Sequence, residues 1–227
     1  MKIGILGSGM VAQIIGPKLL EKGDEVMLSS RDITKEKRSF PSAKDWAVQQ
    51  TSKGLKAYAG RFAEAAIFGD IVINCTSGAH SIEALTLAGE SNLGDKILID
   101  LANPLDFSKG TPPSLTIANT NSLGEEIQNT FPELKVVKTL NTINAEVMIN
   151  PGGINGEHEL FICGNDEDAK NLVKNEILVN RFHWKNVIDL GDLSAARGME
   201  AYLILWVRLM NKLGTASFNI HIQKGNE

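Results

Sequence analysis

The sequence predicts an α/β protein with a doubly wound, mostly parallel sheet and a small helical C-terminal elaboration. Short apolar runs of strand length alternate along the chain with amphipathic stretches of helical length. A glycine-bearing turn joins the first apolar run to the first helix, and a long helical pattern lies near the C-terminus. Such alternation is typical of a parallel sheet that is covered by helices on both faces.

The N-terminal residues predict a unit of strand, helix and strand. Residues 2–6 have the pattern of a short buried strand, and residues 10–22 have that of a helix whose apolar side chains fall on one face. Gly23 and Asp24 end this helix, and residues 25–29 form the second strand. The length of the unit suits a right-handed parallel crossover.

The rest of the chain continues the alternation. The pattern of the region 34–60 does not define its structure, except that residues 42–52 have a helical pattern. The run 71–76 is apolar enough to be a central strand covered on both faces. Further strands are predicted at residues 96–101, 135–141, 159–164 and 186–191. Further helices are predicted at residues 61–68, 80–89, 122–129, 166–178 and 194–213.

The segment GSGMVA, residues 7–12, fits the pattern G-x-G-x-x-A between a predicted strand and a predicted helix. In this place the pattern is typical of dinucleotide binding. Gly7 lets the chain turn sharply, Gly9 lets a pyrophosphate approach the backbone, and Ala12 lets the helix pack on the strand. The alternative interpretation is a tight turn that requires glycine for its geometry alone.

The end of the second strand indicates which dinucleotide binds. The N–H groups near Met10 and Val11 would meet the pyrophosphate at the positive end of the helix dipole. In NAD-selective proteins an acidic residue about 20 positions past the glycines holds the ribose diol. This chain has Ser30 and Arg31 there, which favours the dianionic 2′-phosphate of NADP. Lys35 would add a third contact. In the alternative, Arg31 is a solvated charge and Asp32 takes the diol.

Polar and small residues follow three of the predicted strands, at the edge of a doubly wound sheet where ligands bind. We expect them to contact the nicotinamide, its ribose or a second flat ring. These candidates are Thr76, Ser77, His80, Asn103, Asn141 and Ala145. His80 is the only histidine near a predicted strand end, and such a residue is more often a helix start than a ligand.

The chain has no recognisable proton relay, nucleophile elbow or metal-ligand spacing, so we predict neither a catalytic side chain nor a metal. Direct hydride transfer between two flat rings fits this pattern, because the protein then needs only to hold the rings face to face. We therefore predict an NADP-binding domain over residues 1–150. Residues 151–227 form an α/β and helical elaboration packed with it.

Composition excludes several classes of partner. The 227 residues are 43% hydrophobic and 22% charged, with a formal net charge of -4 and no block of one sign, so we expect neither nucleic acid nor a membrane surface as partner. The N-terminus lacks the pattern of a signal peptide. The apolar run 201–207 is far shorter than the roughly 20 residues of a membrane span. We expect a cytoplasmic protein.

Several blocks together resemble the coenzyme F420-dependent NADP oxidoreductase family, and the NADPH-binding domain of the STEAP proteins has the same pattern. The blocks are GSGMVA, SSRD, VVKTLNTINA, CGNDEDAK and IDLGDLSAARGMEAYLILW. The resemblance implies a Rossmann domain and hydride exchange between NADP(H) and a deazaflavin (F420) or a flavin. Archaeal deazaflavin enzymes tend to have histidine in place of Asn141 and proline in place of Asn144, which bears on the second ring.

The resemblance also implies roles by position. The pyrophosphate would be held by Ser8, Gly9, Met10 and Val11. The 2′-phosphate would be held by Ser30, Arg31 and Lys35. Ser77 and Ala145 would line the nicotinamide, with Asn103 in the same pocket.

Alternatives of a different class stay open at this point. The chain could be a non-catalytic NADP(H)-sensing protein that lost its second site, or an NADPH-dependent reductase of a small carbonyl, imine or ferric complex. The C-terminal helical pattern is apolar almost all round, which predicts either a homodimer interface or complete burial in the core of its own chain.

Overall fold

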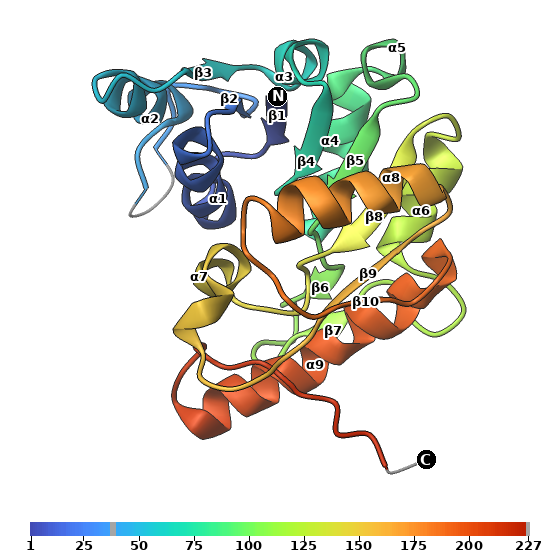
Figure 1. Ribbon diagram of the computed structural model, residues 1–227. Coiled ribbons are helices and arrows are strands. Elements are labelled where there is room, and N and C mark those ends of the chain that lie inside the picture. Colours follow the sequence, from blue (N-terminus) through green and yellow to red (C-terminus); the bar gives the residue numbers. More distant parts are fainter. Residues whose placement is uncertain (37–39, 226–227) are drawn as a thin grey trace.

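An eight-stranded sheet organises the computed structural model, which describes residues 1–36 and 40–225 (Figure 1). The strand order is β10-β9-β8-β5-β4-β1-β2-β3. The strands are β1 (Lys2–Leu6), β2 (Glu25–Ser29), β3 (Ala57–Gly60), β4 (Ile71–Asn74), β5 (Ile97–Asp100), β8 (Lys135–Thr139), β9 (Leu160–Gly164) and β10 (Val187–Asp189). Every neighbouring pair is parallel except β8 and β9. The expected mostly parallel α/β fold is confirmed.

Helices cover both faces of the sheet and bury two apolar cores. One core packs α1 (Met10–Glu21), α2 (Ala43–Thr51), α7 (Ala145–Ile149) and the π-helix η3 (Val173–Val179) on the sheet. The other packs α3 (Phe62–Phe68), α4 (Ser81–Ala88), α5 (Glu90–Leu93) and α6 (Leu123–Thr130) on the opposite face. The central strands β1 and β4 are mostly apolar because both of their faces are buried; the exceptions are the exposed Lys2 at the start of β1 and Asn74 at the end of β4.

Strands from both sides of residue 150 belong to the same sheet. Val137 of β8 pairs with Gly164 of β9, so residues before and after the predicted domain boundary share backbone hydrogen bonds. The division into 1–150 and 151–227 stays a prediction. The two parts are joined through a continuous ladder.

Short elements account for most differences from the predicted pattern. The edge strand β3, the five-residue α7 and the hairpin of β6 (Leu105–Asp106) and β7 (Ser114–Leu115) carry too few residues for a periodic signal. The helix expected at 166–178 is α8 (Glu167–Leu172), which continues into η3. The spacing of polar and apolar residues over 166–178 does not distinguish an α-helix from a π-helix.

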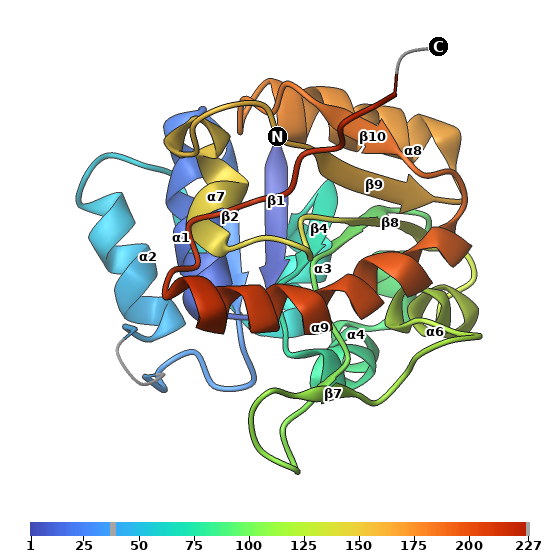
Figure 2. The same ribbon diagram turned by 90° about the horizontal axis from the view of Figure 1, so that it is seen from below.

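The last helix, α9 (Ala196–Leu213), follows the short 3-10 turn η4 (Leu193–Ala195). It crosses the molecule from beside α6 to below α7 (Figure 2). Met199, Leu203 and Val207 face the core and are buried, whereas Leu205 is 54% exposed. Complete burial of this helix in its own chain is therefore wrong, because its outward side meets solvent.

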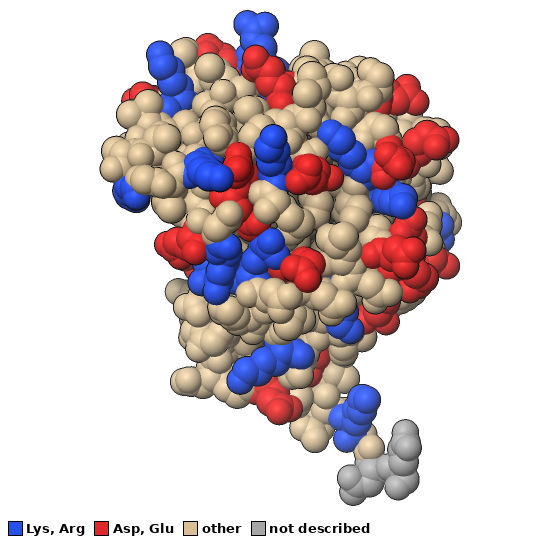
Figure 3. All heavy atoms as spheres, turned by 45° about the horizontal axis from the view of Figure 1, so that its top comes forward, with Lys and Arg blue, Asp and Glu red and all other residues tan. Residues whose placement is uncertain are grey.

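Charged side chains of both signs are interspersed on the face in Figure 3. Within residues 1–36 and 40–225, no helix is both long and apolar enough to span a membrane.

Candidate cofactor site

The turn between β1 and α1 has the geometry of an anion cradle. Gly7 has φ of 116°, and a Cβ on it would lie 2.8 Å from the carbonyl oxygen of Cys75, so the protein's own backbone requires glycine there. Gly9, the N-cap of α1, has no such constraint because a Cβ on it would meet nothing within 4 Å. Its missing side chain leaves space above the helix N-terminus.

Ser8 lies between the two glycines and is 1% exposed. Its hydroxyl is buried without a hydrogen-bond partner among the described residues. A buried unpaired hydroxyl costs free energy unless a ligand pairs with it. The open space at Gly9, this hydroxyl and the free N–H groups of the first turn of α1 together fit a pyrophosphate. Met10, 54% exposed, would contribute its backbone there.

A cavity of about 200 Å³ opens beside this turn, between the carboxyl ends of β1 and β4. It brings together seven of the predicted residues: Gly7, Ser8, Gly9, Arg31, Thr76, Ser77 and His80. Its other lining residues, missed by sequence reasoning, are Phe62, Cys75, Glu83 and Ala84. Glu83 could have been found, because it lies three residues after His80, the N-cap of α4, in the first turn of that helix.

Arg31 lies on the rim of the cavity, where its Nη1 is 3.2 Å from Oε1 of Glu83. The Nδ1 atom of His80 is 3.4 Å from the other carboxylate oxygen of Glu83. The Arg31 and Glu83 side chains are 64% and 51% exposed. An exposed ion pair contributes only about 0 to 1 kcal/mol, so a dianionic phosphate could take the guanidinium from it.

The other two predicted 2′-phosphate contacts are less available. The Ser30 hydroxyl is buried and donates to the carbonyl of Asp32 at 2.7 Å. Lys35 is exposed and does not line the cavity. The Asp32 carboxylate accepts hydrogen bonds from the side chain and backbone of Thr34, which lower its pKa. It caps its own turn and does not line the cavity.

Asn103 and Asn141 form a reciprocal amide pair next to the cavity. The Nδ2 atom of Asn103 donates to the backbone carbonyl of Asn141, and Nδ2 of Asn141 donates to Oδ1 of Asn103, both at 2.9 Å. A Cβ on Gly78 would lie 2.0 Å from the Asn103 carbonyl oxygen, so the loop that carries Ser77 packs directly on Asn103. The Oδ1 atom of Asn141 is buried and has no partner among the described residues.

The remaining predicted contacts lie outside the cavity lining. Ala145 begins α7 and is 4% exposed, after Asn144, whose side chain caps that helix by accepting from the backbone N–H of Glu146. Val11 is partly buried in the first turn of α1. Within the described part of the chain, no three His, Cys, Asp or Glu side chains are grouped as metal ligands.

The fold and this site define a Rossmann-type dinucleotide-binding protein. Residues 2–104 match the family described as NADP oxidoreductase, coenzyme F420-dependent. The chain is 30% identical over 229 residues to the F420-dependent NADP reductase of Methanocaldococcus jannaschii, an alignment that covers 98% of each protein. It belongs to this family and is an NADP-dependent oxidoreductase.

Two further similarities agree with this family. A crystal structure of a candidate F420-dependent NADP reductase from Arthrobacter sp. FB24 is 45% identical, covers 99% of this chain and 100% of that one, and superposes with a TM-score of 0.91. Metalloreductase STEAP3 of Rattus norvegicus is 28% identical over 200 residues, which are 88% of this chain and 36% of that protein. The chain therefore spans about a third of STEAP3.

Proposed function

We propose that this protein transfers a hydride between NADP(H) and a deazaflavin, coenzyme F420, or a flavin. The observation that supports this best is the glycine cradle with Arg31 on its rim, in a chain that aligns over its whole length with an F420-dependent NADP reductase. When bound, NADPH supplies the hydride from its nicotinamide ring.

Different residues along the cavity bind different parts of NADP(H). Ser8, Gly9 and the first turn of α1 hold the pyrophosphate by hydrogen bonds and the helix dipole. Arg31 holds the 2′-phosphate and selects NADP over NAD. Ser77, with Asn103 packed beneath its loop, orients the nicotinamide end.

The site needs no acid or base from a side chain for this reaction. The hydride passes from a nicotinamide carbon to a ring atom of the acceptor, a carbon in a deazaflavin and a nitrogen in a flavin. This step depends on the approach and alignment of the two rings, at about 3 to 3.5 Å, and water can supply the accompanying proton. His80 lies on the cavity wall beside Glu83, and its role is to line the adenosine side. We assign no catalytic residue.

The direct test is turnover with defined acceptors. Purified protein with NADPH is followed at the absorbance bands of NADPH and of the acceptor, with F420, FMN or a ferric chelate in separate cuvettes. Reduction of F420 or FMN supports the proposal. Arg31→Ala serves as the matched control, since it should raise the NADPH concentration that is needed without changing the acceptor preference.

A second candidate function is NADPH-dependent reduction of a ferric complex, which the similarity to a metalloreductase favours. Turnover of the ferric chelate without that of F420 or FMN would support it and contradict our proposal. Tight NADP binding without turnover of any acceptor would instead indicate the NADP-sensing alternative.

We also infer that the chain forms a homodimer through α9 and acts in the cytoplasm. Leu205 and Leu213 lie two turns apart on α9 and are 54% and 56% exposed. A second subunit would remove this apolar surface from water.

A further inference from the structure

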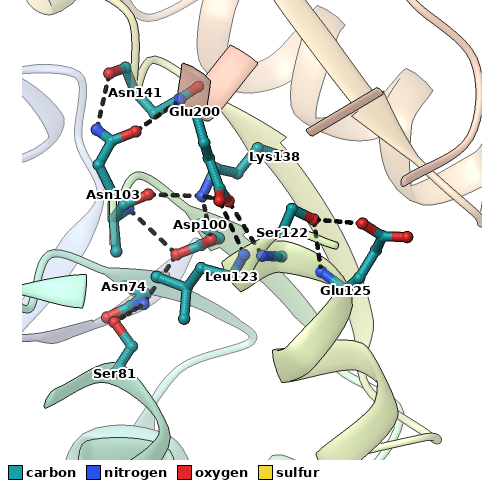
Figure 4. A network of polar contacts seen from close by, with 12 residues as sticks. Asn74, Ser81, Asp100, Asn103, Ser122, Leu123, Glu125, Lys138, Asn141 and Glu200 are labelled. Carbon is teal, nitrogen blue, oxygen red and sulfur yellow. Dashed lines mark hydrogen bonds and ion pairs between the residues drawn. The ribbon is translucent and has the colours of Figure 1, made fainter. Parts of the chain in front are cut away.

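Three charged side chains are completely buried beside the cofactor loops (Figure 4). The ammonium of Lys138, from β8, is 2.7 Å from Asp100 Oδ2, at the end of β5, and 2.7 Å from Glu200 Oε1 in α9. The exposed fractions of the three side chains are 0%, 0% and 1%. We call Lys138, Asp100 and Glu200 the buried triad.

Hydrogen bonds satisfy the charges of the buried triad. The third donor of the Lys138 ammonium goes to the carbonyl of Ala102 at 2.5 Å. Burial acts to lower the pKa of Lys138, but the two carboxylates outweigh it and raise that pKa, so the ammonium stays protonated. Glu200 accepts from the backbone N–H groups of Leu123 and Gly124, in the first turn of α6.

The buried triad continues into the loop after β5. The Oδ1 atom of Asp100 accepts from the backbone N–H of Ala102 at 3.2 Å, while Lys138 holds the carbonyl of the same residue. Both polar groups of Ala102 are thus held, and Asn103 is the next residue. The direction in which Asn103 leaves the strand, toward Asn141 and the Ser77 loop, depends on the triad.

It also continues into the loop after β4. The Nδ2 atom of Asn74 donates to Asp100 Oδ1 at 2.8 Å. The side-chain Oδ1 atom of Asn74 accepts from the backbone N–H and the hydroxyl of Thr76. Thr76 lines the cavity and precedes Ser77. One ammonium is therefore connected to both loops at the nicotinamide end of the site and, through Glu200, to α9.

Stability alone does not explain three buried charges. Taking ions out of water is costly, and apolar side chains of similar volume are often equally or more stabilising at such positions. What apolar packing lacks is direction, because hydrogen bonds fix the angle and register of the groups that they join.

We propose that Glu200 and Lys138 are positioning residues for hydride transfer, which tie α9 to the loops 76–81 and 101–104 and so set the placement of the nicotinamide. The inference rests on the proposed function. In this proposal the C-terminal helix α9 helps to position the active-site loops, although it contributes no residue to the cavity lining.

The test uses Glu200→Gln, which keeps the shape of the side chain and turns one of its oxygens into a donor. That donor would face the Lys138 ammonium or a backbone N–H, so one connection must break. We expect kcat to fall by about tenfold or more, as small misplacements of reacting groups do. The NADPH dissociation constant should stay within about threefold because the phosphate contacts are distant, and the isotope effect on kcat with 4-deuterated NADPH should rise.

Asp24→Asn is the matched control. Asp24 is another buried, paired carboxylate, 1% exposed, and it lies outside the cavity lining. This variant should lower the melting temperature while kcat and the isotope effect stay unchanged. If Glu200→Gln, assayed well below its melting temperature, matches wild-type kcat and isotope effect, the proposal is wrong.

Two further measurements cover the remaining outcomes. If Glu200→Gln does not fold, the triple variant Lys138→Met, Glu200→Met and Asp100→Asn replaces all three buried ions by neutral groups, and wild-type kcat in that variant would overturn the proposal. If the wild type turns over no acceptor, the proposed function fails, and hydrogen exchange replaces kcat as the readout. Loops 76–81 and 101–104 should then exchange faster in Glu200→Gln than in wild type, while residues 7–12 do not, and equal rates would overturn the proposal.

Discussion

At the scale of single residues, Arg31 is the group that we propose selects the dinucleotide. The exposed guanidinium of Arg31 and the imidazole of His80 both contact the Glu83 carboxylate at the cavity rim. If a 2′-phosphate binds there, the guanidinium exchanges a carboxylate partner with one negative charge for a phosphate with two. This exchange makes NADP binding more favourable, because the exposed ion pair is weak and charge-assisted hydrogen bonds to phosphate are strong.

Arg31→Ala should weaken NADPH binding by roughly ten- to a hundredfold, from the loss of about 1.5 to 3 kcal/mol in charged hydrogen bonds. NADH binding should change much less, and calorimetric titration measures both. The control is Lys56→Ala, which removes another exposed cation, 66% exposed and paired with Glu25. Equal affinity of wild type and Arg31→Ala for NADPH would contradict the assignment.

Gly9→Ala tests whether the space above α1 belongs to a ligand. With φ of -84° and no atom near its Cβ, the position accepts alanine, and stability should stay the same or rise by about 0.4 to 1 kcal/mol. A methyl group in the pyrophosphate position should cost about 1 to 3 kcal/mol of binding, or about five- to 150-fold in NADP affinity. Thermal unfolding with and without NADP measures both effects.

Gly198→Ala is the matched control for this variant, since its Cβ also meets nothing within 4 Å. It lies in α9, where alanine is the better helix former, so stability should rise without any effect on NADP binding. A loss of stability in Gly9→Ala that equals its loss of NADP affinity would indicate a structural role for Gly9.

At the scale of elements, an ion pair with a buried carboxylate joins Asp24, just before β2, to Arg181, just after η3. Asp24 accepts two hydrogen bonds from Arg181, at 2.6 and 2.9 Å, and one from the N-terminal ammonium at 3.0 Å. Burial acts to raise the pKa of Asp24, but these partners outweigh it and lower that pKa. Groups that lie 157 residues apart in the chain are thereby joined.

Arg181→Met should lower the free energy of unfolding at pH 7 by about 3 to 5 kcal/mol, because it leaves a buried carboxylate without its main partner. A carboxyl with a depressed folded pKa stabilises the fold above its unfolded pKa of about 3.9, and this contribution is lost as the pH falls through the folded pKa. The difference between wild type and variant in urea unfolding should therefore be largest near neutral pH and shrink below about pH 4. A difference independent of pH would indicate a packing effect.

At the scale of the whole molecule, the outward side of α9 predicts a second subunit. Light scattering on the eluting protein should give twice the mass of one chain, and Leu205→Asp with Leu213→Asp should give a monomer, because the charges would be buried without partners. Val48→Asp, at a 60% exposed position of α2, is the control and should leave the assembly unchanged. A monomeric wild type would contradict this prediction.

The sequence alone predicted the main strands and helices, because they are long enough for apolar periodicity to appear. It missed β3, α7 and the hairpin of β6 and β7, whose two to five residues are determined by neighbouring elements. Local sequence also located the cradle at residues 7–12, since glycines, strand and helix there are contiguous. The tertiary contacts of Arg31 were harder to predict than the turn. Glu83, in α4, becomes its partner only in the folded chain, where residues 52 positions apart meet.

Local patterns by themselves determined the α/β class, the glycine turn at residues 7–12 and the residues that follow each strand, because these depend on neighbours in the chain. Only the tertiary structure decided that Lys138, Asp100 and Glu200 meet, that Asn103 pairs with Asn141, and that β9 runs antiparallel to β8. Such contacts join residues from distant segments, and their geometry follows from how strands and helices pack. No periodicity along the chain encodes a distance between side chains that far apart.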